Sequence, residues 1–286
     1  MDLSNENVVH IKSNGIEYLQ FRKLLEYPEI KYAYVIGLDK SFKIYSNPIN
    51  EEKQKNILAE NSYKKICEEL NLNYNNVVNT NQNHTDNIKI IDEKINEDEP
   101  DFNIYEDTDG LITNKKEIIL STINADCILL VFYDPVKKVI ANVHSGWKGT
   151  VKRISVKTVE KMKKEFGCNP KDLICCMSPS IGKDHFEVDE DVYDIFKNEF
   201  KDIENKNNDI YEHITKGEEE NKINFQKNKW HIDTILINRL ILEYAGLKKE
   251  NIIDSGICSV CNKDIIHSYR AHGLNSGRAT QIIVLN

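Results

Sequence analysis

Residues 116–150 read KEIILSTINADCILLVFYDPVKKVIANVHSGWKGT, and this stretch decides the fold class. Three runs within it, at residues 116–123, 127–133 and 138–143, are rich in apolar and β-branched residues, which is typical of strands. An Asp-Pro pair separates the second run from the third and predicts a turn there. Because the runs mix alternating with continuous apolar positions, we expect a sheet that is covered on at least one face.

Helices and further strands flank this block on both sides. Apolar residues recur at helical spacing, with Asn50 as the expected first N-cap and Ile57, Leu58, Ile66 and Leu70 as one buried face. The predicted helices cover residues 50–70, 149–166, 189–200 and 233–244, and the other predicted strands cover residues 32–36, 76–80, 88–91, 173–177, 265–268 and 279–285. With no internal repeat and no Pro/Gly-rich linker, residues 1–286 are expected to form one integrated α/β domain.

The composition is that of a soluble globular protein. The chain has 286 residues, of which 40% are hydrophobic and 29% charged, and its formal net charge is -8. The acidic balance disfavours a general nucleic-acid binder, and no apolar run reaches the ~18 residues of a membrane span, so neither nucleic acid nor membrane is an expected partner. Residues 1–15 show no basic region followed by an apolar stretch. We therefore expect a cytoplasmic protein whose seven cysteines are reduced thiols or metal ligands.

Two segments are strongly biased in composition. Residues 92–109 hold nine acidic residues and one lysine, and they are expected to form a solvated acidic loop. Residues 201–228 are rich in Lys, Asn and Glu with few apolar groups, and they are expected to be a low-complexity insertion between two helices.

Three short segments carry residues suited to metal chemistry. They are NQNH, which ends at His84, NADC, which ends at Cys127, and HSGWKGT, which begins at His144. A thiolate with two imidazoles is a standard ligand set for zinc, and three protein ligands leave a fourth position for water or substrate. Cys127 opens one predicted strand and His144 follows the next, so an antiparallel hairpin would bring both to one sheet edge. The alternative from spacing alone is a small buried cysteine beside ordinary core or surface histidines.

Cationic residues near these segments are candidates for anion binding. In HSGWKGT the glycines permit close backbone approach, and Lys148 adds positive charge at the start of a predicted helix. Near the C-terminus, Arg270 and Arg278 carry guanidinium groups that fork onto phosphate or carboxylate. A plain strand–helix turn and a surface loop are the alternatives. Cys258 and Cys261 form a single CxxC without the second pair that a tetrahedral zinc needs, and we interpret them as structural.

Several ordered motifs in this chain resemble the multicopper polyphenol oxidase, or laccase-domain, family, whose members are described as purine nucleoside phosphorylases. The resemblance spans nearly the whole chain and rests on Gln82 with His84 in NQNH, DGLIT at 109–113, ADC at 125–127, HSGWKGT at 144–150, SPSIGKDHFEV at 178–188, and the closing SYR and SGR. The sequence departs from the family pattern at Asp184 and His185, where two cysteines often stand, at Ala271 and His272 after SYR, and at Lys148, where an arginine is frequent.

The resemblance implies an α/β fold of layered, mixed β-sheets flanked by helices. It implies a zinc site at His84, Cys127 and His144, with copper as the metal of the family's older oxidase label. It also implies phosphorolysis of the purine nucleosides adenosine, inosine and S-methyl-5′-thioadenosine, together with deamination of adenosine. On this interpretation Lys148, Arg270 and Arg278 are the candidate groups for holding phosphate.

Three other functions compete with this interpretation. A copper-dependent polyphenol oxidase is disfavoured because the eight histidines include no His-x-His pair, whereas multinuclear copper needs many grouped histidines. A Cys–His hydrolase would use Cys127 as nucleophile and His144 as base. A zinc-stabilised binding module without catalysis would unfold when the metal is chelated.

Overall fold

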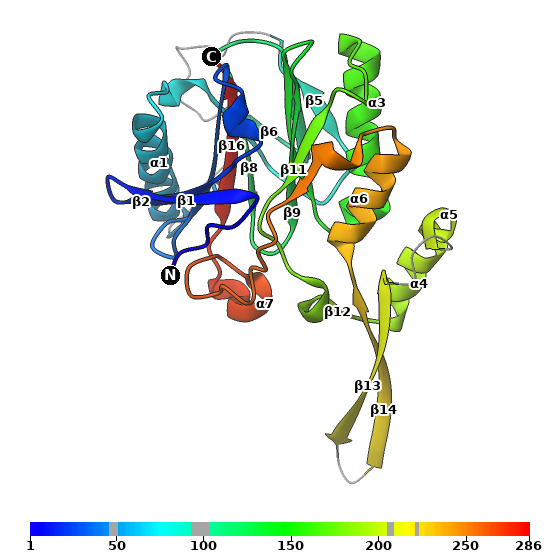
Figure 1. The fold of residues 1–286 in the computed structure, drawn as a ribbon. Helices are drawn as coiled ribbons and strands as arrows, with labels where there is room; N and C mark the ends of the chain where they lie inside the picture. The colour runs from blue at the N-terminus through cyan, green and yellow to red at the C-terminus, as the bar shows by residue number, and fades with distance from the viewer. Residues whose placement is uncertain (46–50, 93–102, 205–208, 221–222) are drawn as a thin grey trace.

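A computed structural model describes residues 1–45, 51–92, 103–204, 209–220 and 223–286 of the chain. The fold is mixed α/β, with β-sheets that are flanked by helices (Figure 1), which confirms the predicted fold class. Within these ranges, no helix combines the length and the apolar character that crossing a membrane requires.

The first sheet contains strands from both the beginning and the end of the sequence. Over the described residues its strand order is β1 (Val8–Ser13), β2 (Ile16–Phe21), β3 (Ile30–Ile36), β16 (Ala279–Leu285), β8 (Ile119–Asn124), β4 (Val77–Thr80) and β6 (Asn103–Tyr105). β16 runs antiparallel to both of its neighbours, β3 and β8. The last strand of the chain therefore completes the sheet that the first strands begin.

The second sheet contains the predicted central hairpin. Its strand order over the described residues is β15 (Ile252–Asp254), β11 (Ile174–Met177), β9 (Ile128–Asp134), β10 (Val139–Ser145), β7 (Gly110–Thr113) and β5 (Ile88–Ile90). β9 and β10 pair antiparallel, with Ile128 opposite Ser145 and Leu129 opposite His144. The start of β9 and the end of β10 therefore meet at one sheet edge, as predicted.

The two sheets pack face to face over the main hydrophobic core. Apolar residues of both sheets fill this layer, among them Leu120 on β8 and Val131 on β9. A polar link crosses the layer, because the buried Asn142 side chain on β10 donates to the carbonyl oxygens of Leu120 and Gln281, at 2.9 and 2.8 Å. Buried polar groups are costly unless they are hydrogen-bonded, so this link favours a single arrangement of the sheets.

Helices cover the outer faces of both sheets. α1 (Glu51–Glu69) packs on the first sheet through Tyr63 and Ile66. α3 (Ile154–Phe166) and α6 (Thr234–Tyr244) lie on the opposite side of the molecule, against the second sheet (Figure 1). The layers therefore run helix, sheet, sheet, helix.

The buried face of α1 matches the predicted one at Ile66 and in part at Leu70, but not at the start of the helix. Ile57 and Leu58 are exposed, whereas Tyr63 is fully buried with its hydroxyl 2.7 Å from that of Ser121. The helix is rich in charged residues, so its apolar periodicity is weak, and small residues share the buried side with one tyrosine: the buried residues are Ala59, Ser62, Tyr63, Ile66 and Cys67. Asn50, the expected N-cap, lies outside the described residues.

The helix predicted over residues 149–166 is interrupted. α2 (Trp147–Val151) ends before Arg153, whose φ of 57° is left-handed, and α3 begins at the next residue. The Arg153 guanidinium forms ion pairs with Glu199 and Asp202. Apolar spacing continues across this break, so periodicity alone could not reveal it.

The predicted strand at residues 265–268 is wrong. Ile265 ends a turn and residues 266–268 are irregular, although Ile266 and His267 are 0% and 5% exposed, because an apolar run can be buried without pairing in a sheet. Strands β1, β2, β6, β7 and β15 were not predicted, and neither was the short strand Glu187–Asp189. The other predicted strands correspond to β3, β4, β5, β8, β9, β10, β11 and β16, and the remaining predicted helices to α4 (Glu190–Glu199) and α6.

The segment predicted as a low-complexity insertion contains regular structure. α5 (Lys201–Glu204) is followed by the antiparallel strands β13 (Tyr211–Glu220) and β14 (Ile223–Ile232), which project from the two-sheet body (Figure 1). β12 (Glu187–Asp189) pairs with β14. Lys and Asn residues concealed the strand pattern. Most of the predicted acidic loop, residues 93–102, lies outside the described residues.

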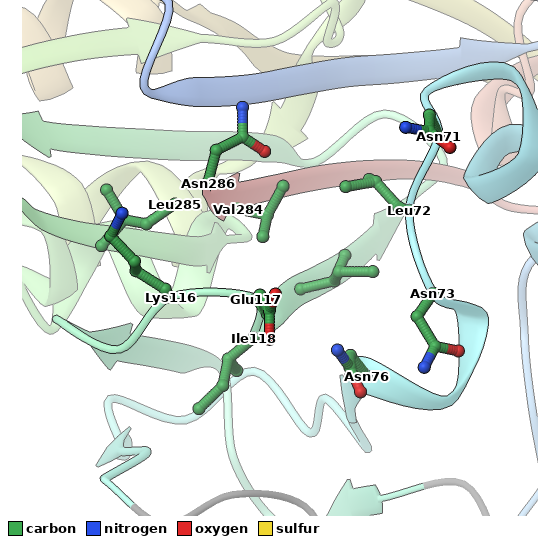
Figure 2. Close-up of a pocket in the computed structure, with 11 residues that line it drawn as sticks. Asn71, Leu72, Asn73, Asn76, Lys116, Glu117, Ile118, Val284, Leu285 and Asn286 are labelled. Carbon is green, nitrogen blue, oxygen red and sulfur yellow. The ribbon is translucent and has the colours of Figure 1, made fainter.

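A cavity of about 330 Å³ lies where β16 ends (Figure 2). The described residues that line it are mainly asparagines and aliphatic side chains, with Lys116 and Glu117 as the charged pair. None of them is a histidine or a cysteine, so this cavity offers no soft metal ligand.

Candidate metal centre

His84, Cys127 and His144 converge although they are far apart in sequence. The Cys127 Sγ lies 3.9 Å from His84 Nε2, and the His84 and His144 rings stand edge to face with centroids 5.0 Å apart. One ligand atom from each residue lies within 4.8 Å of the other two. The structure therefore brings together the three residues on which the sequence resemblance placed a metal.

The loop that carries His84 is attached to the first sheet. The Gln82 side chain forms two hydrogen bonds with the backbone of Ile123, at 2.7 and 2.8 Å. On the other side of the site, the Asn124 side chain donates to the carbonyl oxygens of Cys127 and Pro179. The side chains of Gln82 and Asn124 therefore form the backbone hydrogen bonds that a neighbouring strand would form in a sheet.

The backbone around the ligands adopts conformations that need support. His84 and Asp126 have positive φ angles of 58° and 85°, which are uncommon for residues other than glycine and often mark functional sites. Gly146 lies so close to the ligands that an added Cβ would be 2.6 Å from His84 Cδ2 and 3.2 Å from Cys127 Sγ. The first glycine of HSGWKGT, Gly146, is therefore required because its backbone lies against the side chains of His84 and Cys127.

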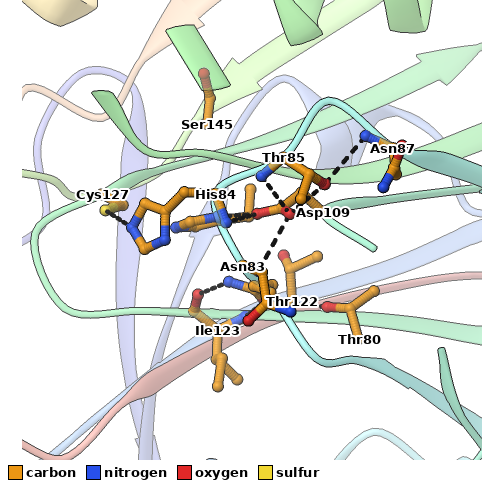
Figure 3. A network of polar contacts seen from close by, with 12 residues as sticks. Thr80, Asn83, His84, Thr85, Asn87, Asp109, Thr122, Ile123, Cys127 and Ser145 are labelled. Carbon is orange, nitrogen blue, oxygen red and sulfur yellow. Dashed lines mark hydrogen bonds and ion pairs between the residues drawn. The ribbon is translucent and has the colours of Figure 1, made fainter. Parts of the chain in front are cut away.

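Asp109 orients two of the three ligands from behind (Figure 3). It is fully buried, and its Oδ1 lies 2.7 Å from His144 Nδ1 and accepts the backbone N–H of His84 at 3.1 Å. Its Oδ2 accepts the backbone N–H and the hydroxyl of Thr85. Because Nδ1 of His144 is engaged, Nε2 is left as the ligand atom, an arrangement that is common behind metal-bound histidines.

Asp109 was not among the predicted site residues. It opens the DGLIT motif directly before β7, where a carboxylate ahead of a buried strand was the available signal. A single sequence does not say which histidine such a carboxylate faces, because that depends on the pairing of β7 with β10.

The charges of the site are coupled. Burial raises the pKa of the Cys127 thiol, but His144 and His84 outweigh this effect and lower it to about 6. Burial lowers the pKa of His144, but the Cys127 thiolate and the Asp109 carboxylate outweigh it and raise the pKa to about 9. Without a metal, the Cys127 thiolate and the His144 imidazolium therefore each favour the charged form of the other.

These residues fit a zinc ion. A tetrahedral ion with bonds of about 2.3 Å to sulfur and about 2.1 Å to nitrogen holds those atoms ~3.6 Å apart, close to the 3.9 Å between Cys127 and His84. The thiolate and the carboxylate behind His144 supply negative charge for a dication. Copper also accepts thiolate and imidazole ligands, so the donor set is suited to both metals.

The three ligands lie in the wall of a cavity of about 550 Å³, a size typical of small-molecule sites. Aromatic side chains line it at Trp147, Phe186 and Tyr269, together with the aliphatic Ile44 and Ile181. Apolar walls beside a metal centre are suited to a small, partly apolar ligand.

Comparison with known proteins identifies the family. A sequence profile described as multi-copper polyphenol oxidoreductase laccase matches residues 48–286. The chain belongs to this family. The resemblance indicated by the motifs is thereby confirmed.

Relatives within the laccase family carry names of nucleoside enzymes. The chain is 34% identical over 176 residues to purine nucleoside phosphorylase YlmD of Bacillus subtilis (strain 168), which covers 62% of this chain and 58% of that protein. It is 32% identical over 216 residues to adenosine deaminase RL5 of an unknown prokaryotic organism, which covers 74% and 76%. The match to human purine nucleoside phosphorylase LACC1 is 27% identical over 246 residues and spans 85% of this chain but half, 50%, of that protein.

Solved structures share the fold of this laccase-family chain. The hypothetical protein YfiH of Bacillus licheniformis superposes with a TM-score of 0.78 at 22% identity, covering 96% of this chain and 100% of that one. YlmD of Geobacillus stearothermophilus gives a TM-score of 0.78 at 18% identity, with 100% of both chains covered. At these identities the likeness concerns the fold.

The predicted cationic residues lie in two different settings. Arg270 and Arg278 line the cavity, and backbone carbonyls hold both guanidinium groups, those of His185 and Glu187 for Arg270. Lys148 is exposed on α2, with its ammonium over the ring of Trp147, and does not line the cavity. Lys43, which does line it, was not predicted because it lies in an irregular segment without a motif.

Cys127 of this laccase-family chain is expected to react with iodoacetamide at unusually low pH once metal is removed. Its rate should rise through a midpoint near pH 6 and not near its ordinary value of 9.0, because a lowered pKa leaves the thiolate populated at lower pH. The exposed Cys261 is the internal comparison, since burial and Cys258 raise its pKa. Peptide mass spectrometry after timed alkylation gives both profiles, and a Cys127 midpoint at or above that of Cys261 would contradict the coupling to His144.

Proposed function

We propose that this chain is a zinc-dependent purine nucleoside phosphorylase that acts on adenosine, inosine and S-methyl-5′-thioadenosine and also deaminates adenosine. The observation that carries the proposal is the convergence of His84, Cys127 and His144, within 4.8 Å, in the wall of a cavity that two arginines also line. The names of its relatives, purine nucleoside phosphorylase and adenosine deaminase, support the same chemistry.

The chain's own residues divide the work of binding. Arg270 and Arg278 would bind phosphate through charge-assisted hydrogen bonds, and the carbonyls that hold their guanidinium groups make them preorganised. Trp147, Phe186 and Tyr269 would contact the faces of the purine. Asp109 would keep His144 in the tautomer that presents Nε2. Zinc held by His84, Cys127 and His144 would supply Lewis-acid chemistry to this cavity.

Two reactions would share this cavity. In phosphorolysis, a bond forms between a phosphate oxygen and C1′ while the C1′–N9 bond breaks, and the purine leaves with the electron pair and takes up a proton. In deamination, water adds at C6 and ammonia leaves. Neither reaction transfers electrons to an external acceptor, so neither requires redox-active copper.

Product analysis tests the proposal directly. Protein with measured zinc content is incubated with adenosine, with and without phosphate, and the products are separated. Adenine with ribose 1-phosphate marks phosphorolysis, whereas inosine in both incubations marks deamination. Fully zinc-loaded protein that forms neither product would refute the proposed function.

Substitution of Arg278 by glutamine is expected to raise the KM for phosphate by about 10- to 100-fold, because a lost hydrogen bond to a charged group is worth about 1.5–3 kcal/mol. Lys148→Gln removes a positive charge that lies outside the cavity lining and should change this KM far less. Initial rates at saturating adenosine measure both effects. An equal effect of the two substitutions would show that general charge, and not the cavity position, controls phosphate binding.

A Cys–His hydrolase is the second candidate, since Cys127, whose pKa is lowered, lies beside His144, which in turn contacts Asp109. The two hypotheses differ in what protects the thiol. If the Cys127 thiol is a metal ligand, zinc alone should block its alkylation. If it is a nucleophile, a substrate without zinc should block its alkylation.

A further inference from the structure

A second group of soft ligands lies on the surface of the chain. His185, Cys258 and Cys261 each present a ligand atom within 4.8 Å of the other two. The Cys258 Sγ is 3.6 Å from His185 Nδ1, and the Cys261 Sγ is 3.9 Å from the same nitrogen. The two sulfurs therefore face one ring nitrogen.

These distances suit a tetrahedral ion. Bonds of about 2.3 Å to sulfur and about 2.1 Å to nitrogen place the two kinds of atom ~3.6 Å apart, which agrees with both contacts. The backbone N–H of Gly182 donates to the Cys258 Sγ at 3.3 Å, a contact that stabilises a thiolate. In the sequence this CxxC lacked a further ligand, and the structure supplies one from a position 73 residues away.

We propose that His185, Cys258 and Cys261 bind a second zinc ion, separate from the one at Cys127, with its fourth position open to solvent. Two thiolates and one imidazole are a soft set that selects zinc over magnesium or calcium. Binding releases the thiol protons to solvent, so the affinity rises with pH. Cys261 is exposed, which gives the ion a route of entry.

The position of this second site indicates what it stabilises. It joins the loop after β11 to the loop after β15, which are already in contact through a bridge between Ser180 and Cys258. The first of these loops contacts Arg270 directly, because the carbonyl of His185 accepts from its guanidinium. The second reaches it through Asp126, which accepts from the hydroxyl of Ser259 and from the Arg270 backbone N–H. The second zinc would therefore brace the wall of the cavity without contacting its interior.

Metal analysis of variants tests the second site. We expect about two zinc ions per chain in the wild type, one in Cys127→Ala, one in Cys258→Ser or His185→Asn, and none in the double variant Cys127→Ala/Cys258→Ser. The control Cys67→Ala removes a buried thiol of α1 and should keep both ions. Zinc that is absent from Cys127→Ala, or content that is unchanged by Cys258→Ser, would overturn the proposal.

A measurement on the unaltered chain guards against misfolded variants. Cobalt(II) added to metal-free protein gives a thiolate charge-transfer band for each occupied site, and titration should saturate at two equivalents. After alkylation of Cys127 near pH 6, the protein should still bind one equivalent of cobalt(II), at the second site. A disulfide between Cys258 and Cys261 under reducing conditions, detected by mass, or saturation at one equivalent that disappears on alkylation, would refute the second site. Because Cys127→Ala isolates this site, its failure is distinguishable from failure of the proposed function.

Discussion

Replacement of Cys127 by alanine is expected to remove zinc from the centre and to lower both phosphorolysis and deamination of adenosine by more than about 100-fold. The thiolate is the one anionic ligand among His84, Cys127 and His144, and its loss leaves two imidazoles. Changing a group behind a metal ligand already costs about 10- to 100-fold in affinity or activity, so loss of a ligand should cost more. Metal content and product yield are measured on the same preparation.

The result separates the candidate functions. In a Cys–His hydrolase the same substitution abolishes activity but need not follow the metal content, whereas here activity and the first zinc should be lost together. Cys67→Ala is the matched control, because it removes a buried thiol from α1, away from the cavity. A Cys127→Ala protein that retains its zinc at this centre and its nucleoside cleavage would contradict the assignment of the centre.

The hairpin β9–β10 explains why part of this site could be predicted. Its two runs are apolar and β-branched, its turn contains proline, and its antiparallel pairing brings Cys127 and His144 to one edge. These are local signals. His84 comes from a loop after β4 of the first sheet, so its approach to Cys127 depends on how the two sheets pack. Residue type made it a candidate ligand, and the family resemblance placed it at the same site as the other two.

Residues that act through long-range pairing could not be read from local patterns. Asp109 faces His144 because β7 pairs with β10, and His185 faces Cys258 because the loops after β11 and β15 meet. Lys148, which a motif marked as a phosphate candidate, is exposed on α2 over the ring of Trp147 and does not line the cavity, so its role stays a prediction. Residue types and their spacing therefore identify candidate ligands, whereas the pairing of distant segments decides which residues share a site.

Substitution of Asp109 by asparagine is expected to weaken zinc binding at the Cys127 centre by about 10- to 100-fold, with activity falling in parallel at limiting zinc. The side chain keeps its size but loses the charge that helps to raise the pKa of His144, and its amide can donate where the carboxylate accepts from Thr85. His144 would then be held less firmly in the tautomer that presents Nε2.

Competition with a chelator of known affinity measures the zinc dissociation constant of Asp109→Asn. Asp107→Asn is the matched control, because it is the same change two residues earlier in an exposed side chain that contacts Asn83 and Asn87 but none of the three ligands. Excess zinc should restore most of the activity of Asp109→Asn, since the ligands themselves are intact. An unchanged zinc dissociation constant, or an equal loss of zinc affinity in both variants, would show that the Asp109 carboxylate does not support metal binding through His144.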